Sequence, residues 1–337
     1  MLALSGGVDS SVCAALLKKE GYDVKAVVMK MSPAHDGTVE GARQVAKSLD
    51  IPLTVLDLTE VFEEKVITPF INDYKNASTP NPCVICNPYV KFHYLLEQAK
   101  KEGCDLIATG HYCSIGYENG RYFIKKSDCT ERDQSYMLYR LSQEVLERLI
   151  FPLSSYDKKK VREIAREMGL SCAEAPDSQE NCFIPSNDYG AYIEERCGKF
   201  PAGDFISPEG EKCGRHKGII HYTVGQRKGL GIALGKPAFI KEIDSETNSI
   251  YLAYDGGQNK DEILVGDISF MAISSLTEPT FAEVKIRSAA KCERAVLTPA
   301  EDGFIKVNFE KSVRAPARGQ SAVFYLGDKV LGGGFIL

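Results

Sequence analysis

Compact apolar runs alternate with amphipathic stretches through the first half of the chain. Residues 24–29 (VKAVVM) and 52–58 (PLTVLDL) are suited to parallel strands, the first of them buried on both faces. Between them, residues 38–49 carry apolar side chains on one stripe at helical spacing. The same periodicities predict strands at residues 1–4 and 105–109 and helices at residues 12–20, 61–74 and 155–168. This alternation predicts an α/β fold, a doubly wound and mostly parallel sheet with ligands at the carboxyl ends of its strands.

The pattern changes beyond about residue 188. Residues 238–243, 249–253, 282–286 and 304–309 are short alternating segments separated by Gly, Asp, Asn and Pro, which is typical of β-barrels and β-sandwiches. A second boundary is expected at the Asp-Gly-Gly turn of residues 255–257. We therefore expect three domains, an α/β domain over residues 1–188 and two β domains over residues 189–255 and 256–337.

The most informative segment is residues 5–11 (SGGVDSS), which join the first apolar run to the first helix. Two glycines let backbone amides approach a ligand closely, and a turn that opens a helix forms an anion site. Ser10 and Ser11 add hydroxyl groups, and Asp9 supplies a carboxylate suited to Mg²⁺ or to fixing the turn. The loop lacks the Gly-Lys-Ser/Thr ending of a Walker A motif, so no lysine of its own reaches the terminal phosphates. The alternative is a glycine-rich turn that binds nothing.

A second candidate for chemistry is the proline-punctuated segment 79–88 (TPNPCVICNP), which precedes a helical pattern. Asn87 is suited to be the N-cap of that helix and Pro88 to be its first residue. Cys86 would then lie just outside a helix N-terminus, where the positive field favours the thiolate and lowers the pKa of the thiol. The alternative is a small buried cysteine with only a packing role.

The other candidate cysteine is Cys182, in the polar loop 177–183 (DSQENCF), where reactive groups are common. Only the fold could bring it near Cys86. Cys83 and Cys86 form a C-x₂-C pair, but the sequence has no second such pair for a four-cysteine zinc site. Cys83, Cys86 and Cys182 could ligate a 4Fe–4S cluster with one open iron, or could carry out thiol–disulfide exchange. The residues alone do not choose between these two, and the other cysteines are expected to pack in the interior.

The composition is typical of a globular protein with more than one domain. The chain has 337 residues, 44% hydrophobic and 26% charged, which is enough for two or three globular domains. No apolar run is long enough to span a bilayer, and the glycine-rich loop begins too early for a signal or transit peptide. Eleven cysteines without such a signal favour reduced thiols in the cytoplasm. The net charge of −5 does not favour nucleic acid, but a local basic face would be enough to bind it.

The motifs together resemble one family. Residues 5–10 match the SGGxDS signature of the PP-loop ATP pyrophosphatases, which have an adenine nucleotide alpha hydrolase-like fold and cleave ATP to AMP. ATGHY at residues 108–112, RDQSYML at 132–138, HYTVGQRKGLGI at 221–232 and GQSAVFY at 319–325 extend the resemblance to bacterial tRNA-specific 2-thiouridylases of the MnmA/TrmU type. This resemblance implies a PP-loop domain, a small central β domain and a C-terminal β-barrel. It also implies ATP- and Mg²⁺-dependent replacement of oxygen by sulfur at C2 of the wobble uridine (U34) in Lys, Glu and Gln tRNAs.

The resemblance assigns roles by position. Cys182 would accept sulfur as a persulfide from a relay protein or a cysteine desulfurase, and Cys86 would pair with it in a disulfide as sulfur is released. Asp9 and Cys83 would complete the catalytic set. ATP would be bound by Ala3, Leu4, Ser5, Gly6, Gly7, Val8, Asp9, Ser10, Met29 and Gly110. The target base and the rest of the tRNA would contact Asn81, Pro82, Cys83, His111, Arg132, Asp133, Gln134, Arg287, Ser288 and Gln320. Arg227 and Lys228, on a glycine-flanked turn, could hold tRNA phosphates or could form a solvated hairpin tip.

Two departures from the family pattern matter. Cys83 stands where many members carry an aspartate that is a proposed base, which leaves the proton acceptor unassigned and favours a cluster. Residues 30–38 form a shorter loop than usual and the first strand has only four residues, so the mouth of the nucleotide site should differ. Three other functions fit parts of the pattern: a cluster-dependent tRNA thiolase for the same or another base, an adenylating ligase without a cysteine pair, and a non-catalytic nucleotide-binding module.

Overall fold

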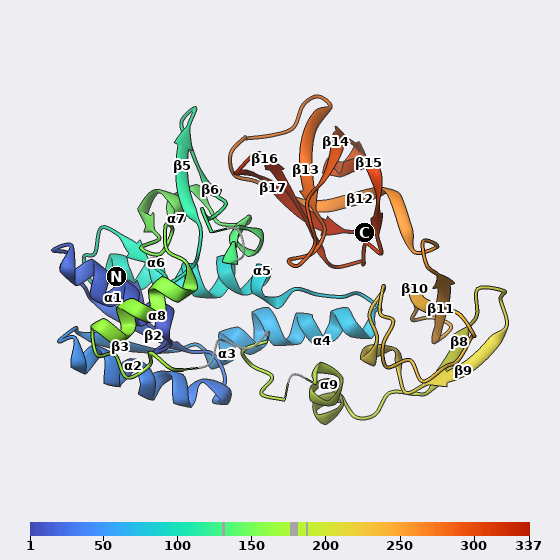
Figure 1. Cartoon of the computed structure of the whole chain (residues 1–337), viewed down its shortest axis with the longest axis horizontal. Coiled ribbons are helices and arrows are strands. Elements are labelled where there is room, and N and C mark those ends of the chain that lie inside the picture. Colours follow the sequence, from blue (N-terminus) through green and yellow to red (C-terminus); the bar gives the residue numbers. More distant parts are fainter. Residues whose placement is uncertain (130–131, 176–180, 187) are drawn as a thin grey trace.

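The computed structural model describes residues 1–129, 132–175, 181–186 and 188–337, which form three sheets with helices around the first (Figure 1). The first sheet has the strand order β3-β2-β1-β4-β7, and every pairing in it is parallel. The chain reverses its direction across the sheet between β1 and β4, so their carboxyl ends form the switch point at which such folds bind ligands. The strands are β1 (Leu2–Ala3), β2 (Ala26–Lys30), β3 (Leu53–Asp57), β4 (Ile107–Ala108) and β7 (Leu149–Ile150).

Helices cover both faces of this sheet. They are α1 (Val8–Lys19), α2 (Asp36–Ser48), α3 (Thr59–Phe62), α4 (Thr68–Lys75), α5 (Pro82–Cys86), α6 (Phe92–Lys101), α7 (Gln143–Arg148), α8 (Lys158–Glu167) and, beyond the sheet, α9 (Tyr189–Cys197). Val27 and Val28 are neighbours in β2, and because side chains alternate along a strand they belong to separate hydrophobic clusters. Val28 shares its cluster with residues of α1, α2 and α8, and Val27 shares its cluster with residues of α3, α4 and α6. The predicted doubly wound α/β class is therefore confirmed.

Two single π-helical turns join neighbouring helices into longer runs. Glu63–Ile67 connects α3 to α4, and Asn87–Lys91 connects α5 to α6. Pro69 follows the first turn and Pro88 lies inside the second. A proline within a helix has no N–H and clashes with the carbonyl four residues before it, and a wider turn relieves both problems. Among the described helices, none combines the length and the apolar character that crossing a bilayer requires.

The second sheet is small and has the order β10-β11-β8-β9. Its inward side chains, which include Phe205, Ile240 and Ile250, are fully buried and belong to the same cluster as Val27 of the first sheet. This shared cluster packs the small domain against the α/β domain. The strands are β8 (Gly203–Ile206), β9 (Lys212–His216), β10 (Ala238–Asp244) and β11 (Ser249–Tyr254).

The third sheet closes on itself, because β12 pairs with both β15 and β17. Around this barrel the order is β12-β15-β14-β13-β16-β17 and the pairings are antiparallel. Buried and exposed residues alternate along the first part of β15, as expected for a strand with one face inside the barrel. The barrel strands are β12 (Asn259–Phe270), β13 (Thr280–Lys285), β14 (Glu293–Pro299), β15 (Ile305–Arg314), β16 (Ser321–Leu326) and β17 (Lys329–Ile336). The C-terminal β-barrel implied by the resemblance is present.

A hairpin from the α/β part of the chain extends this sheet. Its strands are β5 (Ser114–Glu118) and β6 (Arg121–Lys125), and Lys125 pairs with Lys329 of β17. In Figure 1 the hairpin rises from the α/β domain toward the barrel. Sequence analysis did not predict it.

Candidate active site

A cavity of about 470 Å³ opens at the carboxyl ends of β1, β2 and β4. Leu4 and Ser5 line it after β1, Met29 lines it from β2, and Gly110 lines it after β4. Cys86 and Cys182, which lie far apart in the sequence, line the same cavity. The fold therefore brings the glycine-rich loop and the two candidate cysteines to one site.

The glycine-rich loop is held in a defined shape. Gly6 has a φ of +72°, and a Cβ built there would lie 2.5 Å from the Gly41 carbonyl carbon in α2. The Ser10 hydroxyl accepts a 3.1 Å bond from the Ser5 N–H, and the Ser11 hydroxyl donates a 2.8 Å bond to the Gly7 carbonyl. Gly7 is the N-cap of α1 and offers no side chain to the first N–H groups of the helix. Those N–H groups are thus available to an anion.

Asp9 is held by two groups that the sequence did not reveal. Nζ of Lys158, at the start of α8, donates to both carboxylate oxygens over 2.7 Å, and the Tyr112 hydroxyl donates over 2.6 Å. Burial, followed by this bond, raises the pKa of Tyr112. These bonds tie α1 to α8, and Asp9 also lines the cavity, so both of its expected roles stay predictions.

The predicted environment of Cys86 is wrong. The helix begins at Pro82, where the Asn81 side chain caps the Cys83 N–H at 3.2 Å, and it runs on through Cys86 into the π turn and α6. Cys86 therefore lies inside a helical run rather than before one. It is 7% exposed with its Sγ 3.9 Å from Sδ of Met31, and burial raises its pKa to about 12.

Asn87 is not an N-cap. It is buried, and its Nδ2 donates a 2.9 Å hydrogen bond to the Met137 carbonyl. Pro88 lies in the π turn and does not begin the helix.

Cys182 is an exposed residue, yet the protein around its thiol excludes enough water to raise its pKa to about 11. Burial also raises the pKa of Cys83. Charge on Cys83 or Cys182 would raise the pKa of Cys86 further, so the three thiols lie near one another. Within the described residues, however, no group of three or more His, Cys, Asp or Glu side chains is placed to hold a metal ion. Free thiols near one another suit thiol–disulfide exchange, and a cluster held by them stays a prediction. Residues 177–180 of the predicted loop lie outside the described residues.

Comparison with known proteins identifies the family. The tRNA methyl transferase HUP domain model matches residues 1–186, the tRNA methyl transferase PRC-barrel domain model matches residues 190–254, and the aminomethyltransferase beta-barrel domain model matches residues 260–336. The tRNA-specific 2-thiouridylase MnmA of Clostridium acetobutylicum is 46% identical over 349 residues, covering 100% of this chain and 98% of that protein. This chain belongs to the MnmA family. The MnmA of Clostridioides difficile is 45% identical and covers 100% of this chain and 97% of its own length.

Two solved structures resemble parts of this MnmA-family chain. The U34-tRNA thiolase NcsA from Methanococcus maripaludis, solved with its 4Fe–4S cluster, has a TM-score of 0.37 at 18% identity, covering 58% of this chain and 66% of that one. NMN synthetase from Francisella tularensis has a TM-score of 0.36 at 16% identity, covering 58% and 71%. Such TM-scores are too low to say anything about the function of this chain.

Most residues that the MnmA resemblance assigns to ATP line the cavity. Gly110 lies so close to the loop that a Cβ there would be 3.0 Å from the Ser10 backbone nitrogen. Gly6 lies in the loop and Val8 begins α1, and neither is among the lining residues. The lining residues of the predicted ATP set are Ala3, Leu4, Ser5, Gly7, Asp9, Ser10, Met29 and Gly110.

The residues assigned to tRNA divide into two groups. One group lines the cavity, together with Cys86, Cys182 and the glycine-rich loop. Its members are Pro82, Cys83, His111 and Gln134. Asp133 does not line the cavity, and its carboxylate accepts hydrogen bonds from the chain itself. The donors are the N–H of Ser127 and the N–H and hydroxyl of Ser135.

The others lie outside the cavity. Arg287 donates to the carbonyls of Val224 and Ala315 and so joins the small domain to the barrel. Ser288 and Arg132 are exposed. Gln320 donates to the Thr79 carbonyl over 2.8 Å.

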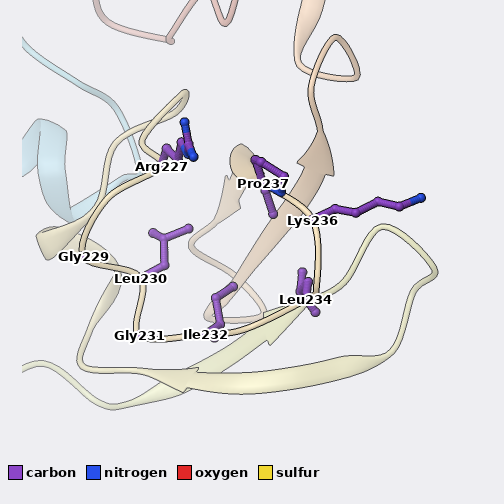
Figure 2. A pocket seen from close by; sticks show the side chains of 9 residues that line it. Arg227, Gly229, Leu230, Gly231, Ile232, Leu234, Lys236 and Pro237 are labelled. Atoms are coloured by element: carbon purple, nitrogen blue, oxygen red, sulfur yellow. The ribbon is translucent and has the colours of Figure 1, made fainter.

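Arg227 and Lys228 are exposed on a loop of the small domain. Arg227 lines a second cavity, of about 240 Å³, together with Leu230 and Lys236, and Lys236 extends away from the loop (Figure 2). The structure does not bring this loop to the first cavity.

Sequence reasoning missed one further cation at the main site. Lys91 lines the cavity, and its charge opposes the effect of burial on the pKa of Cys83, Cys86 and Cys182. It follows Cys86 by five residues and ends the π turn Asn87–Lys91, and both residues line the cavity. In a regular α-helix the residue that shares a face with Cys86 would be four positions away. The sequence pattern therefore did not indicate Lys91.

Proposed function

We propose that this chain is a tRNA-uridine 2-sulfurtransferase that adenylates the C2 oxygen of the wobble uridine (U34) with ATP and replaces that oxygen with sulfur. One observation carries the proposal: the phosphate loop, Cys86 and Cys182 line a single cavity. Methyl transfer, which two of the matching domain descriptions mention, gives no role to this pair of thiols. Two relatives that match the chain over its whole length are 2-thiouridylases.

The first step is adenylation. The free N–H groups at the start of α1 and the Ser10 hydroxyl receive the phosphates of ATP, and the uridine O2 attacks the α-phosphorus. The O2–P bond forms as pyrophosphate leaves with the electron pair of the broken P–O bond. Mg²⁺, when bound beside Asp9, would stabilise the charge on the departing pyrophosphate. The oxygen, a poor leaving group before this step, can now depart as AMP.

The second step transfers sulfur. A persulfide on Cys182, supplied by a cysteine desulfurase or a relay protein, attacks C2, and AMP leaves. The Cys86 thiolate then attacks the sulfur bonded to Cys182, which forms a Cys86–Cys182 disulfide and leaves the outer sulfur on C2. The two thiol sulfurs are oxidised as the transferred sulfur is reduced. A thiol reductant restores both cysteines before the next turnover.

Membership of the family supports a proposal for the substrates and the compartment. The tRNAs are those for Lys, Glu and Gln, and the bound uridine leaves the anticodon stack to enter the cavity, which costs a few kcal/mol. Free thiols at all eleven cysteines are in keeping with a cytoplasmic enzyme. The proposed cycle uses no iron–sulfur cluster.

The test is thiolation of an unmodified Glu tRNA transcript by the whole chain, with ATP, Mg²⁺, a cysteine desulfurase and cysteine. The wild type should form 2-thiouridine and release AMP and pyrophosphate. Cys86→Ala and Cys182→Ala should each form none, because each loses one half of the disulfide step, while pyrophosphate release continues. Nucleoside mass analysis measures the product.

Cys197→Ala is the matched control, because Cys197 is exposed at the end of α9 and does not line the cavity. Its product yield should equal that of the wild type. Thiolation that persists in Cys182→Ala would remove the persulfide from the mechanism. Activity that requires bound iron, measured as metal content and by chelation, would replace it with the cluster route.

A further inference from the structure

His111 is a buried titratable side chain that the resemblance assigns to tRNA contact and to which the proposed reaction gives no chemical step. It lines the cavity directly after Gly110 and is 9% exposed. Its Nδ1 lies 2.7 Å from Oγ1 of Thr109, its ring stacks on Phe92 with 5.7 Å between centroids, and the ring of Phe151 meets it edge-on. These contacts fix the ring. Nε2 makes no hydrogen bond to the described part of the protein.

The His111 ring is connected to both halves of the site. Gly110, the residue before it, abuts the phosphate loop at Ser10. Phe92, on which it stacks, begins α6 in the same helical run that carries Cys86. His111 lines the same cavity as Cys86 and the glycine-rich loop, so a uracil bound there can contact its ring.

The reaction needs a proton acceptor there. When the uracil O2 bonds to phosphorus, positive charge develops on the ring and the N3–H must lose its proton. The carboxylate of Asp9 is held by Lys158 and Tyr112, and thiols whose pKa burial has raised keep their protons. Cys83 is such a thiol and cannot serve.

Among the lining residues, a neutral imidazole meets this need. Burial lowers the pKa of His111 well below its usual value, and the positive charge of Lys91 acts in the same direction. No other charged group contributes to this shift among the described residues, since Phe92 and Phe151 pack on the ring. The ring is therefore unprotonated at neutral pH, as a base must be before the reaction.

We propose that Nε2 of His111 accepts the N3 proton of the target uracil as its O2 attacks the α-phosphorus of ATP. This inference rests on the proposed function. It requires the tautomer in which Nδ1–H donates to Thr109 Oγ1, so that the lone pair of Nε2 faces the substrate. The N–H bond pair becomes the C2=N3 double bond, and the C2=O2 pair forms the O2–P bond. When the sulfur is finally released on C2, the proton returns from His111 to N3.

A weak base is sufficient at this position. Bonding of O2 to phosphorus makes N3–H strongly acidic, and the triphosphate of bound ATP brings negative charge near the ring. His111 need only remove a proton that the reaction is already releasing.

The experiment compares wild type and His111→Gln, because glutamine can still bond Thr109 but cannot take up a proton. Pyrophosphate release and 2-thiouridine formation should both fall about 100-fold or more, the usual contribution of a general base. The decisive arm uses a tRNA transcript made with 5-fluorouridine, whose electron-withdrawing fluorine acidifies N3–H. The defect of His111→Gln should shrink at least about tenfold on this substrate, whereas a defect in folding or in binding would not change.

His93→Gln is the matched control, because His93 is exposed on α6, and it should keep wild-type rates on both tRNAs. Imidazole added to His111→Gly should restore part of the rate if that variant folds, which its melting temperature reports. Equal rates for wild type and His111→Gln overturn the proposal, as does a loss that 5-fluorouridine leaves unchanged. A fluorouridine-sensitive loss in His35→Gln, the other cavity histidine, with none in His111→Gln also overturns it. If the wild type releases pyrophosphate but forms no 2-thiouridine, it is the proposed function that fails.

Discussion

At the scale of single residues, the state of the cysteine thiols before catalysis is open to direct measurement. Burial raises the pKa to about 12 for Cys86 and to about 11 for Cys182. Only the thiolate reacts with iodoacetamide, so the alkylation rate of Cys86 should rise about tenfold per pH unit from pH 7 to 10 without a plateau. Mass spectrometry of the peptides gives the rate for each cysteine. Exposed Cys197 provides the reference for reagent and digestion.

A plateau below pH 9 for Cys86 would contradict this prediction. It would mean that the thiol is activated in the free protein, as a helix N-terminus would have done. Because Cys86 is buried in the free protein, deprotonation of its thiol must instead come from the bound substrates or from movement of the loop that carries Cys182.

The helical run around Cys86 shows where sequence reasoning reached its limit. The segment contains two Asn-Pro pairs, Asn81-Pro82 and Asn87-Pro88, and each has the chemistry of an N-cap followed by a first helical residue. The structure uses the first pair as the helix start and absorbs the second in a π turn. A local signal cannot rank two equal starts, because the choice depends on what the helix packs against.

Elements with strong local patterns were predicted well. The valine-rich run at residues 24–29 corresponds to β2, and the stripe at residues 38–49 corresponds to α2. The turn between the first strand and the first helix was predicted, but the helix begins at Val8 and not at residue 12, so Asp9, Ser10 and Ser11 lie in its first turn. Lys158 was missed, since only the packing of α8 on α1 brings it to Asp9. The hairpin β5–β6 was missed as well, since its place in a sheet depends on β17.

The loop between β1 and α1 supports a prediction about its backbone. A methyl group at Gly6 would lie 2.5 Å from the Gly41 carbonyl carbon and 2.6 Å from the Ala42 nitrogen, both backbone atoms of α2 that cannot turn away. Gly6→Ala should therefore displace the loop and reduce pyrophosphate release on the order of 100-fold, the cost of misplacing reacting groups by about 1 Å. A steady-state assay with varied ATP measures the effect.

Gly21→Ala is the control for the backbone conformation alone. Gly21 has a φ of +88° and nothing within 4 Å of an added Cβ. That variant should lose about 1–2 kcal/mol of unfolding free energy and keep its KM for ATP. Similar ATP kinetics for Gly6→Ala and wild type would show that the loop does not need its contact with α2.

At the scale of the whole molecule, the barrel takes part in building the active site. The Thr79 N–H donates to the Arg318 carbonyl over 2.7 Å, and Gln320 donates to the carbonyls of Thr79 and Pro80. These contacts fix the segment directly before Asn81, which caps the cysteine helix. The hairpin β5–β6 forms a second connection between the same two parts of the chain. A domain that the resemblance assigns to tRNA contact thus also positions the cysteines.

A substitution at Gln320 can distinguish the two roles of the barrel, which are positioning the cysteine helix and contacting tRNA. If it positions the cysteine helix, Gln320→Ala should lower kcat for thiolation and leave the KM for tRNA unchanged, because its bonds are made within the protein. The loss of one good and one longer hydrogen bond is about 1–2 kcal/mol, roughly 5- to 30-fold in rate. If Gln320 instead contacts tRNA, KM should rise while kcat holds. Gln44→Ala, on the exposed side of α2 where Gln44 bonds only to Glu40 among the described residues, is the control and should change neither constant. A raised KM with an unchanged kcat would therefore show that Gln320 contacts tRNA. The position of Thr79 would then depend on its hydrogen bond to the Arg318 carbonyl.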